Sequence, residues 1–262
     1  MTPNEDLSAA ELMDLAAKAA EDKHMPAAVA YWRLAAAKGN TDAFLNIGLH
    51  YARLCVAEGH EQTKARYLQS ALSALVAIYL PEYGRPQASL YMGILAEHVA
   101  MLKLSTARTD EELLGVHNLF AKAGEYYTIA ASMEDDQGGM YPQTALNATA
   151  ALYEKGVGVT DTVNLEKAYA LRLQAAEGGF WEAQVNVAVM KYLGQGTERS
   201  LPQAAEWLRK AIPSIAADNP LKQEAAKFLE KIEAEEGPGP ARTDAGIVPP
   251  ALAQLGTKTP TL

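Results

Sequence analysis

The stretch from Asn164 to Ala211 reads NLEKAYALRLQAAEGGFWEAQVNVAVMKYLGQGTERSLPQAAEWLRKA, and its pattern decides the fold. Leu165 and Ala168 recur as Leu201 and Ala204, a step of 36 residues along the chain. Between them lie two helix patterns separated by glycine breaks. A two-helix unit repeated at this spacing predicts a helical solenoid, because one unit alone cannot bury its apolar face.

The same register extends over other parts of the chain. Four nine-residue segments begin with alanine and carry alanine or glycine at the sixth place, namely 43–51, 88–96, 145–153 and 183–191. Small residues at this spacing let a neighbouring helix approach closely. The segments start 45, 57 and 38 residues apart, so the middle units carry insertions. We place these insertions in longer helices at 62–80 and 110–134.

The other helix of each unit has its own repeated position. Tyr31, Leu171 and Trp207 each follow an alanine by three residues and precede a small or apolar pair. We expect these three side chains to fill the space between helix pairs, since burial of a large apolar group stabilises a fold by about 1.5–3 kcal/mol.

The register divides the chain into three parts. Residues 1–6 are expected to form a flexible N-terminus, and residues 7–236 an all-α solenoid with irregular middle repeats. Its last helix, 221–235, has a face rich in lysine and glutamate, which suits a terminal cap. Residues 237–262 contain five prolines and four glycines, so we predict a disordered tail there.

Composition narrows the class of partner. The net charge is −9 and lysine and arginine form no long cluster, so nucleic acid and anionic membranes are poor partners. No apolar run is long enough for membrane insertion. The single cysteine, Cys55, excludes an internal disulfide, and the acidic N-terminus does not resemble a secretory signal. These features lead us to expect a soluble cytoplasmic protein.

The usual catalytic patterns are missing from the sequence. The Gly156-x-Gly158 pair lacks the third glycine and the Lys-Ser/Thr of a phosphate loop, so a connector between repeats is favoured. The five histidines show no metal-binding spacing, and no serine lies in a nucleophile elbow. We therefore predict no catalytic residues, no cofactor and no metal, and a protein that is not an enzyme.

The repeat pattern resembles the Sel-one-like repeat, a variant of the tetratricopeptide repeat. The segments that carry the resemblance are 35–51, 145–161 and 175–190. The family's Gly-x-Gly-Val-x-x-Asp loop is matched by 156–161 and more loosely by 194–196, whereas the match over 60–134 is weak. The resemblance implies a right-handed superhelix of antiparallel helix pairs. It also implies a scaffold, adaptor or regulator, a role frequent in bacterial signalling, envelope or secretion pathways.

By analogy with tetratricopeptide solenoids, the first helix of each pair lines a concave groove that binds a partner protein or peptide. Residues spaced along these helices become the candidate groove residues, namely Asn46, Arg53, Tyr91, His98, Lys155, Asn186 and Tyr192. Tyrosine and arginine often anchor interfaces. Asn46 and Asn186 have a structural alternative, because the family often carries asparagine at that place.

Three functions are compatible with this sequence. The first is a protein-interaction scaffold or adaptor. The second is a dedicated inhibitor, immunity protein or chaperone of a secreted bacterial effector, because a dedicated partner tolerates irregular middle repeats. The third, a β-lactam-binding hydrolase, is disfavoured because the chain lacks the paired cysteines and the signal of such relatives. The sequence leaves the oligomeric state open.

Overall fold

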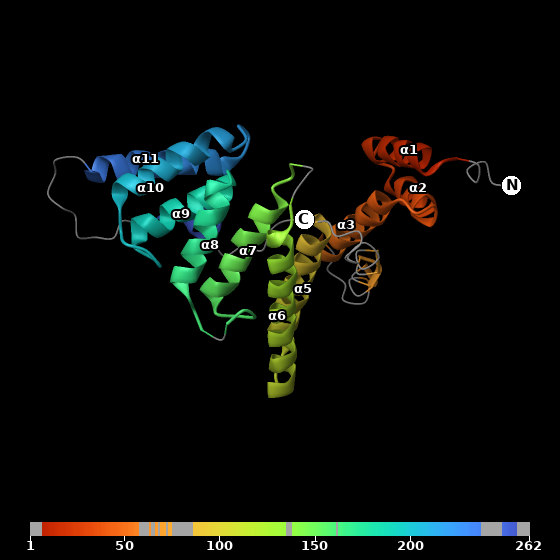
Figure 1. Cartoon of the computed structure of the whole chain (residues 1–262), viewed down its shortest axis with the longest axis horizontal. Coiled ribbons are helices and arrows are strands. Elements are labelled where there is room, and N and C mark those ends of the chain that lie inside the picture. Colours follow the sequence, from red (N-terminus) through yellow and green to blue (C-terminus); the bar gives the residue numbers. More distant parts are fainter. Residues whose placement is uncertain are drawn as a thin grey trace. The chain divides into compact units, whose positions relative to one another are not determined.

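The computed structural model describes residues 7–57, 63, 66–67, 69–71, 73–74, 86–134, 138–160, 162–236 and 248–255. Across these residues every regular element is a helix, which confirms the all-α prediction (Figure 1). The chain divides into two compact units, 1–95 and 96–261, and each unit is described by itself. The helices are α1 (Ala9–Glu21), α2 (Met25–Ala37), α3 (Thr41–Ala57), α5 (Pro86–Thr106), α6 (Asp110–Ser132), α7 (Tyr141–Lys155), α8 (Leu165–Glu177), α9 (Trp181–Leu193), α10 (Leu201–Ala211), η2 (Ile212–Ser214), α11 (Pro220–Glu236) and α12 (Pro250–Leu255).

In the first unit, α1 packs on α2 and α2 packs on α3. Helix α1 begins at a capping box: the Glu11 backbone N–H donates to the Ser8 hydroxyl, and the Glu11 carboxylate accepts from the Ser8 backbone N–H. Leu12 and Ala16 of α1 are fully buried against Trp32 of α2. The unit is thus held by one apolar stripe from each helix, as a solenoid repeat requires.

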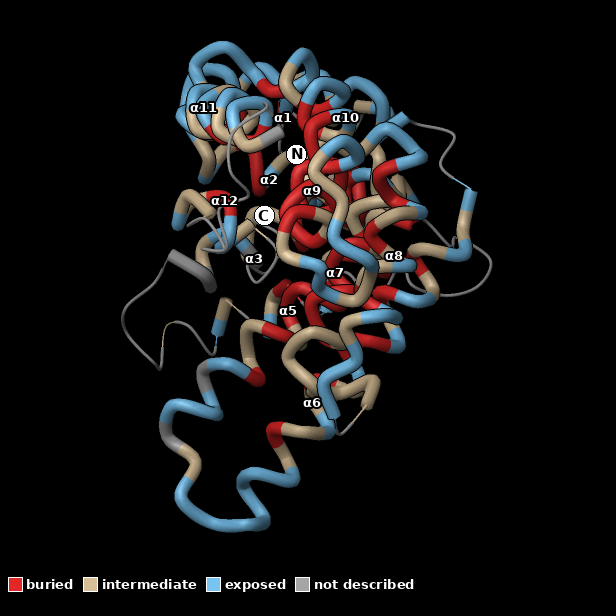
Figure 2. Tube along the Cα trace, turned by 90° about the vertical axis from the view of Figure 1, so that its left-hand side faces the viewer, coloured by how far each residue is buried: buried red, intermediate tan, exposed pale blue. Residues whose placement is uncertain are grey.

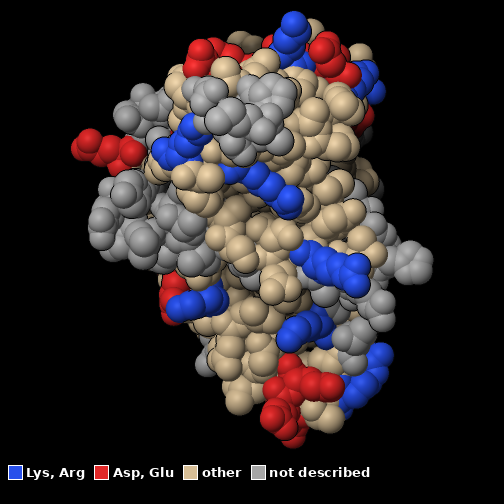
Figure 3. Space-filling view, turned by 90° about the vertical axis from the view of Figure 1, so that its right-hand side faces the viewer, with Lys and Arg blue, Asp and Glu red and all other residues tan. Residues whose placement is uncertain are grey.

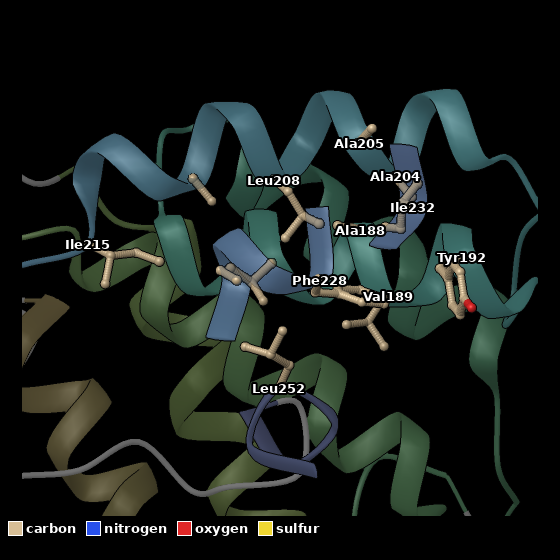
Figure 4. Packing of buried hydrophobic residues seen from close by; sticks show 13 residues of the cluster. Ala188, Val189, Tyr192, Ala204, Ala205, Leu208, Ile215, Phe228, Ile232 and Leu252 are labelled. Carbon is tan, nitrogen blue, oxygen red and sulfur yellow. The ribbon is translucent and has the colours of Figure 1, made fainter. Parts of the chain in front are cut away.

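In the second unit, each helix from α6 to α11 packs on its neighbours in sequence. Buried residues follow the helix–helix contacts, and exposed residues occupy the outer faces (Figure 2). Leu208 of α10 and Phe228 of α11 lie in one cluster of buried side chains with Val189 of α9 (Figure 4). Consecutive packing of this kind propagates along a repeat protein without any long-range closure.

The second helices of the repeats share one core position. Trp32, Arg172 and Leu208 each follow a buried alanine by four residues, and all three are buried. The predicted packing residues Tyr31, Leu171 and Trp207 stand one place earlier and are only half-buried. All three pack against the apolar clusters, as expected of side chains that fill the space between helix pairs, while the more deeply buried stripe continues from the alanine at a spacing of four.

Gly158 lies where the loop after α7 meets α6. Its φ is +75°, and a Cβ at this position would collide with the backbone carbonyl of Phe120. Only glycine fits this approach, because any side chain would push the loop away from α6. The Gly156-x-Gly158 pair therefore joins consecutive helices, as the sequence predicts for a connector between repeats.

The predicted disordered tail is wrong for residues 250–255. These residues form α12, which packs on α9 and α11, and Leu252 is only 1% exposed. Composition favours disorder here, but Leu252 lies in the apolar cluster of the second unit, a tertiary contact that outweighs local propensity. Residues 1–6, 237–247 and 256–262 lie outside the described residues, as does most of the predicted helix at 62–80.

None of the helices in the described part of the chain is long and apolar enough to cross a membrane.

Candidate partner-binding surface

Helices α7, α9 and α11 are the first helices of successive pairs, and we call the side on which they are joined to one another the first-helix face. Two hydrogen bonds link them side by side: Asn186 of α9 donates to Asn147 of α7 at 3.1 Å, and Tyr192 of α9 donates to Glu235 of α11 at 2.9 Å. Both asparagines are buried. These contacts set the spacing of the helices that a partner would meet, because a buried polar group must keep its hydrogen bond.

Tyr192 is the aromatic centre of this surface. Its ring is buried and meets Phe228 edge-on, with the ring centroids 5.1 Å apart. The guanidinium of Arg199 and the ammonium of Lys231 lie 5.5 and 5.6 Å from the ring centroid. The side chain is thus enclosed on both the ring and the hydroxyl. Tyr192 therefore stabilises the packing of these helices and does not project toward a partner.

A second polar cluster ties α7 to α5 and α6. Lys155 Nζ lies 2.9 Å from Glu97 Oε1, and the Tyr127 hydroxyl donates to Glu97 Oε2 at 2.9 Å. Glu97 is 1% exposed. Burial, and then the charge of Glu97, raises the pKa of Tyr127 well above its ordinary value, so the hydroxyl remains a proton donor to the carboxylate.

The structure places the other candidate residues as follows. Asn46 and Tyr91 are half-buried and Arg53 is exposed, all in the first unit, whereas His98 is half-buried on α5 in the second unit. Among the seven candidates, Lys155, Asn186 and Tyr192 occupy positions on α7 and α9 and make the inter-helix contacts given above. For Asn186 this is the structural role that the sequence left open.

Sequence reasoning missed a buried ion pair between α8 and α7. The Arg172 guanidinium binds Glu154 through two hydrogen bonds of 2.5 and 2.7 Å, and Arg172 also lies 3.5 Å from the Met190 sulfur. Burial raises the pKa of the Glu154 carboxyl, and the charge of Arg172 opposes that shift. The signal was present in the repeat register, because Arg172 stands at the place that Trp32 and Leu208 hold in other units.

A cavity of about 290 Å³ opens beside this ion pair. Its wall contains Glu154 and Arg172, together with Asn186 and apolar side chains of α9, and α12 covers one side. The lining residues are Glu154, Leu165, Arg172, Asn186, Val189, Met190, Leu193, Gln195, Leu252 and Ala253. A partly open hollow that combines apolar side chains with a few fixed polar groups has the composition of a binding pocket.

The turn between α5 and α6 carries a second apolar area. Four large side chains near this turn are between 44% and 59% exposed, namely Met101, Leu104, Leu113 and Leu114. Figure 2 shows that this end of the two helices is exposed along most of its length. Grouped apolar side chains that face water are typical of a protein-binding site.

The basic side chains of the described residues, unlike the exposed apolar ones, are not grouped. On the molecular face shown in Figure 3, lysine and arginine side chains are spread among other residues rather than joined in one stripe. Nucleic-acid binding generally uses a continuous basic stripe. Within the described ranges, no group of three or more His, Cys, Asp or Glu side chains is arranged to hold a metal ion.

Comparisons with known proteins agree with this geometry. The Sel1 repeat family matches residues 21–40, 144–180 and 181–212, and the last two matches cover α7–α8 and α9–α10. A Sel1 repeat protein from Oxalobacter formigenes has a similar crystal structure, with a TM-score of 0.53 and 18% identity over 90% of this chain and 91% of that one.

A second similar structure is a protective antigen present in uropathogenic Escherichia coli strains, which displays an SLR fold. Its TM-score is 0.51 at 17% identity, and the match covers 95% of this chain but 53% of the antigen. No curated protein sequence matches the chain. The repeat matches and the shared arrangement of helices lead to one conclusion: this chain contains Sel1 repeats over residues 21–40 and 144–212, and its fold is an all-α helical solenoid of the SLR type.

Proposed function

We propose that this protein is an interaction scaffold that binds a partner protein or peptide on the first-helix face. The observation that carries the proposal is that α12, a short helix from the same chain, already lies on α9 and α11. Its Leu252 side chain enters the apolar cluster there. A surface that accepts one short helix through side-chain burial has the chemistry to accept another.

A binding role fits the polar side chains of this surface better than a catalytic one. Lys155, Asn186 and Tyr192 are each engaged by a residue of a neighbouring helix. Such residues fix the helix spacing, whereas general acid–base catalysis needs a group that can reach a substrate proton. We therefore assign the protein a non-catalytic role, and residence in the cytoplasm stays a prediction from the sequence.

Site-specific photocrosslinking tests the proposal. A photoreactive phenylalanine analogue replaces Gln195, an exposed residue that lines the cavity, or Lys210, an exposed residue of the second helix α10. Expressed in the native host, the Gln195 variant is expected to crosslink a partner that mass spectrometry identifies. The purified partner should then bind the purified wild-type chain. Equal crosslinking from Lys210, or none from Gln195, would reject the first-helix face.

A dedicated inhibitor or chaperone of an effector is a second candidate, and the exposed apolar side chains at the α5–α6 turn favour it. Such a protein would bind its partner through this turn. Leu113→Asp with Leu114→Asp should abolish protection against the partner's toxicity in co-expression, while a Gln195→Glu variant keeps it. Retained protection in the double variant would exclude this surface.

A further inference from the structure

We propose that α12 is an internal occupant of the first-helix face. We further propose that the external ligand of this face is a short amphipathic helix with two leucines three residues apart. The residue directly after its first leucine has a side chain longer than that of alanine. The inference rests on the proposed binding function and specifies both the partner's chemistry and how its access is regulated. The template is Leu252-Ala253-Gln254-Leu255.

We call the site that α12 occupies on α9 and α11 the seat of α12. It is defined by the deeply buried side chain of Leu252. Leu252 is 1% exposed and lies in the cluster that contains Val189, Tyr192 and Phe228. Figure 4 shows its side chain directed toward Phe228 and Val189. Val248 and Leu255 are partly buried against the same cluster. Leucines three positions apart lie on one face of a helix, so both can meet the same surface.

The occupant is easily displaced. Helix α12 has six residues, and a helix this short has almost no stability of its own. Its place depends on the contacts of Leu252, Val248 and Leu255. The connection to α11 spans residues 237–247, enough chain to reach about 35–40 Å. The segment can therefore leave its seat while α11 stays in place, and return as a competitor at high effective concentration.

The seat is also incompletely filled. Ala253 lines the cavity of about 290 Å³ whose wall contains Val189, Met190 and Leu193 as well as the Arg172–Glu154 ion pair. The methyl group of alanine leaves this space open. A longer apolar side chain at the same place of a ligand helix would contact the wall of α9, which gives an external ligand an advantage over α12.

The charge of the segment is consistent with this seat. Residues 248–255 carry no charged side chain. Arg199 and Lys231 lie over the Tyr192 ring, and Arg172 in the cavity wall is bound to Glu154. Recognition of α12 is thus carried by apolar contact. The ligand class that fits is an uncharged leucine-bearing helix rather than an acidic or phosphorylated peptide.

Peptide binding to the full chain tests the proposal. The probe is a fluorescein-labelled synthetic peptide of residues 248–255, together with its Ala253→Met version, and binding is followed by fluorescence anisotropy. The proteins are wild type, Leu252→Asp, and Leu255→Asp as a milder second variant. Pro250→Ser, at an exposed position of α12, is the matched control. Far-ultraviolet circular dichroism establishes that each variant keeps its helices.

Release of α12 should raise the apparent affinity for the peptide at least tenfold in Leu252→Asp, and by a smaller factor in Leu255→Asp. Pro250→Ser should behave as wild type. The Ala253→Met peptide should bind the Leu252→Asp protein several-fold more tightly than the parent peptide.

Two results would overturn the proposal. One is equal affinity, or no saturable binding, in folded Leu252→Asp and wild type. The other is dimerisation of wild type that Leu252→Asp abolishes, measured by sedimentation, which would assign the seat to a second copy of the chain. In either case the crosslinking at Gln195 remains an independent measurement, so the failure of α12 as a template is distinguishable from the failure of the binding surface itself.

Discussion

Lys155 on α7 and Glu97 on α5 form an ion pair with 2.9 Å between Nζ and Oε1, in which the lysine side chain is 24% exposed and the glutamate side chain 1%. The two residues are 58 positions apart in sequence. The pair joins one repeat to the irregular pair of helices that precedes it. The carboxylate is the costly member of this pair, because it is the one removed from water.

Lys155→Met is expected to lower the free energy of unfolding by about 2–3 kcal/mol, since it removes the cation that pairs with the buried Glu97 carboxylate. Glu97→Gln in the same chain should recover part of this loss by removing the buried charge. Urea unfolding followed by circular dichroism measures both. The control is Lys122→Met, which breaks the exposed pair with Glu125 and should change stability by less than about 0.5 kcal/mol. Equal losses of stability in Lys155→Met and Lys122→Met would contradict this account.

Gly158→Ala should destabilise the second unit by more than about 2 kcal/mol, because the new Cβ meets the carbonyl of Phe120 at a backbone φ of +75°. Gly138 provides the matched control, since its φ is +66° but a Cβ added there would meet no atom within 4 Å. Gly138→Ala therefore introduces only backbone strain, about 1 kcal/mol. Thermal unfolding of the two variants separates the collision from the strain, and similar melting temperatures would show that the loop moves freely away from α6.

The sequence predicts the repeats well because their signals are local. Small residues at fixed spacing, Ser8 before α1 and the glycines after α7 all act within a few positions, and the observed helices begin and end close to these signals. The long helix predicted at 110–134 is observed as Asp110–Ser132. Periodicity also selects Asn186 and Tyr192 as residues that face neighbouring helices, although both prove to be buried in contacts with α7 and α11.

Periodicity does not reveal what covers that face. Tyr192 is buried because Glu235 and Phe228 of α11 cover it, and these residues lie more than thirty positions away along the chain. Lys155 is engaged by a glutamate in a region with a weak repeat pattern. The position of α12 is not predictable for the same reason, since a proline- and glycine-rich composition does not show that one leucine makes a tertiary contact. Long-range partners therefore account for most of the difference between the predicted and observed surface.

Arg172 provides a test of how a repeat tolerates a charge at a core position. Arg172→Leu places at this position the residue type found at Leu208, but it leaves Glu154 buried without its cation. We expect a loss of about 3 kcal/mol in the free energy of unfolding at neutral pH. The loss should shrink at acidic pH, because burial already raises the pKa of Glu154 and the protonated carboxyl carries no charge.

Adding Glu154→Leu to Arg172→Leu should restore stability to within about 1 kcal/mol of wild type, because a packed apolar pair often equals a buried ion pair. Denaturant unfolding at pH 7 and pH 5 measures these variants. A double variant that is less stable than Arg172→Leu would mean that the ion pair contributes more than its apolar replacement.

His50 gives the first unit a dependence on pH. The half-buried imidazole lies with ring centroids 5.4 Å from Tyr51 and 6.4 Å from Trp32. Burial, and to a smaller extent the charge of Arg53, lowers the pKa of His50 below 6.5. The unfolded chain therefore binds more protons than the folded chain between the lowered pKa and 6.5, so stability falls as the pH falls through that window.

His50→Gln should remove this part of the pH dependence, measured as the difference in the free energy of unfolding between pH 7.5 and pH 5. Arg53→Gln should raise the pKa of His50 only part of the way toward 6.5, because burial is the larger cause. Nuclear magnetic resonance titration of the His50 ring gives that pKa directly. If Arg53→Gln restored the ordinary value in full, the charge of Arg53 rather than contact with the rings of Trp32 and Tyr51 would control the protonation of His50.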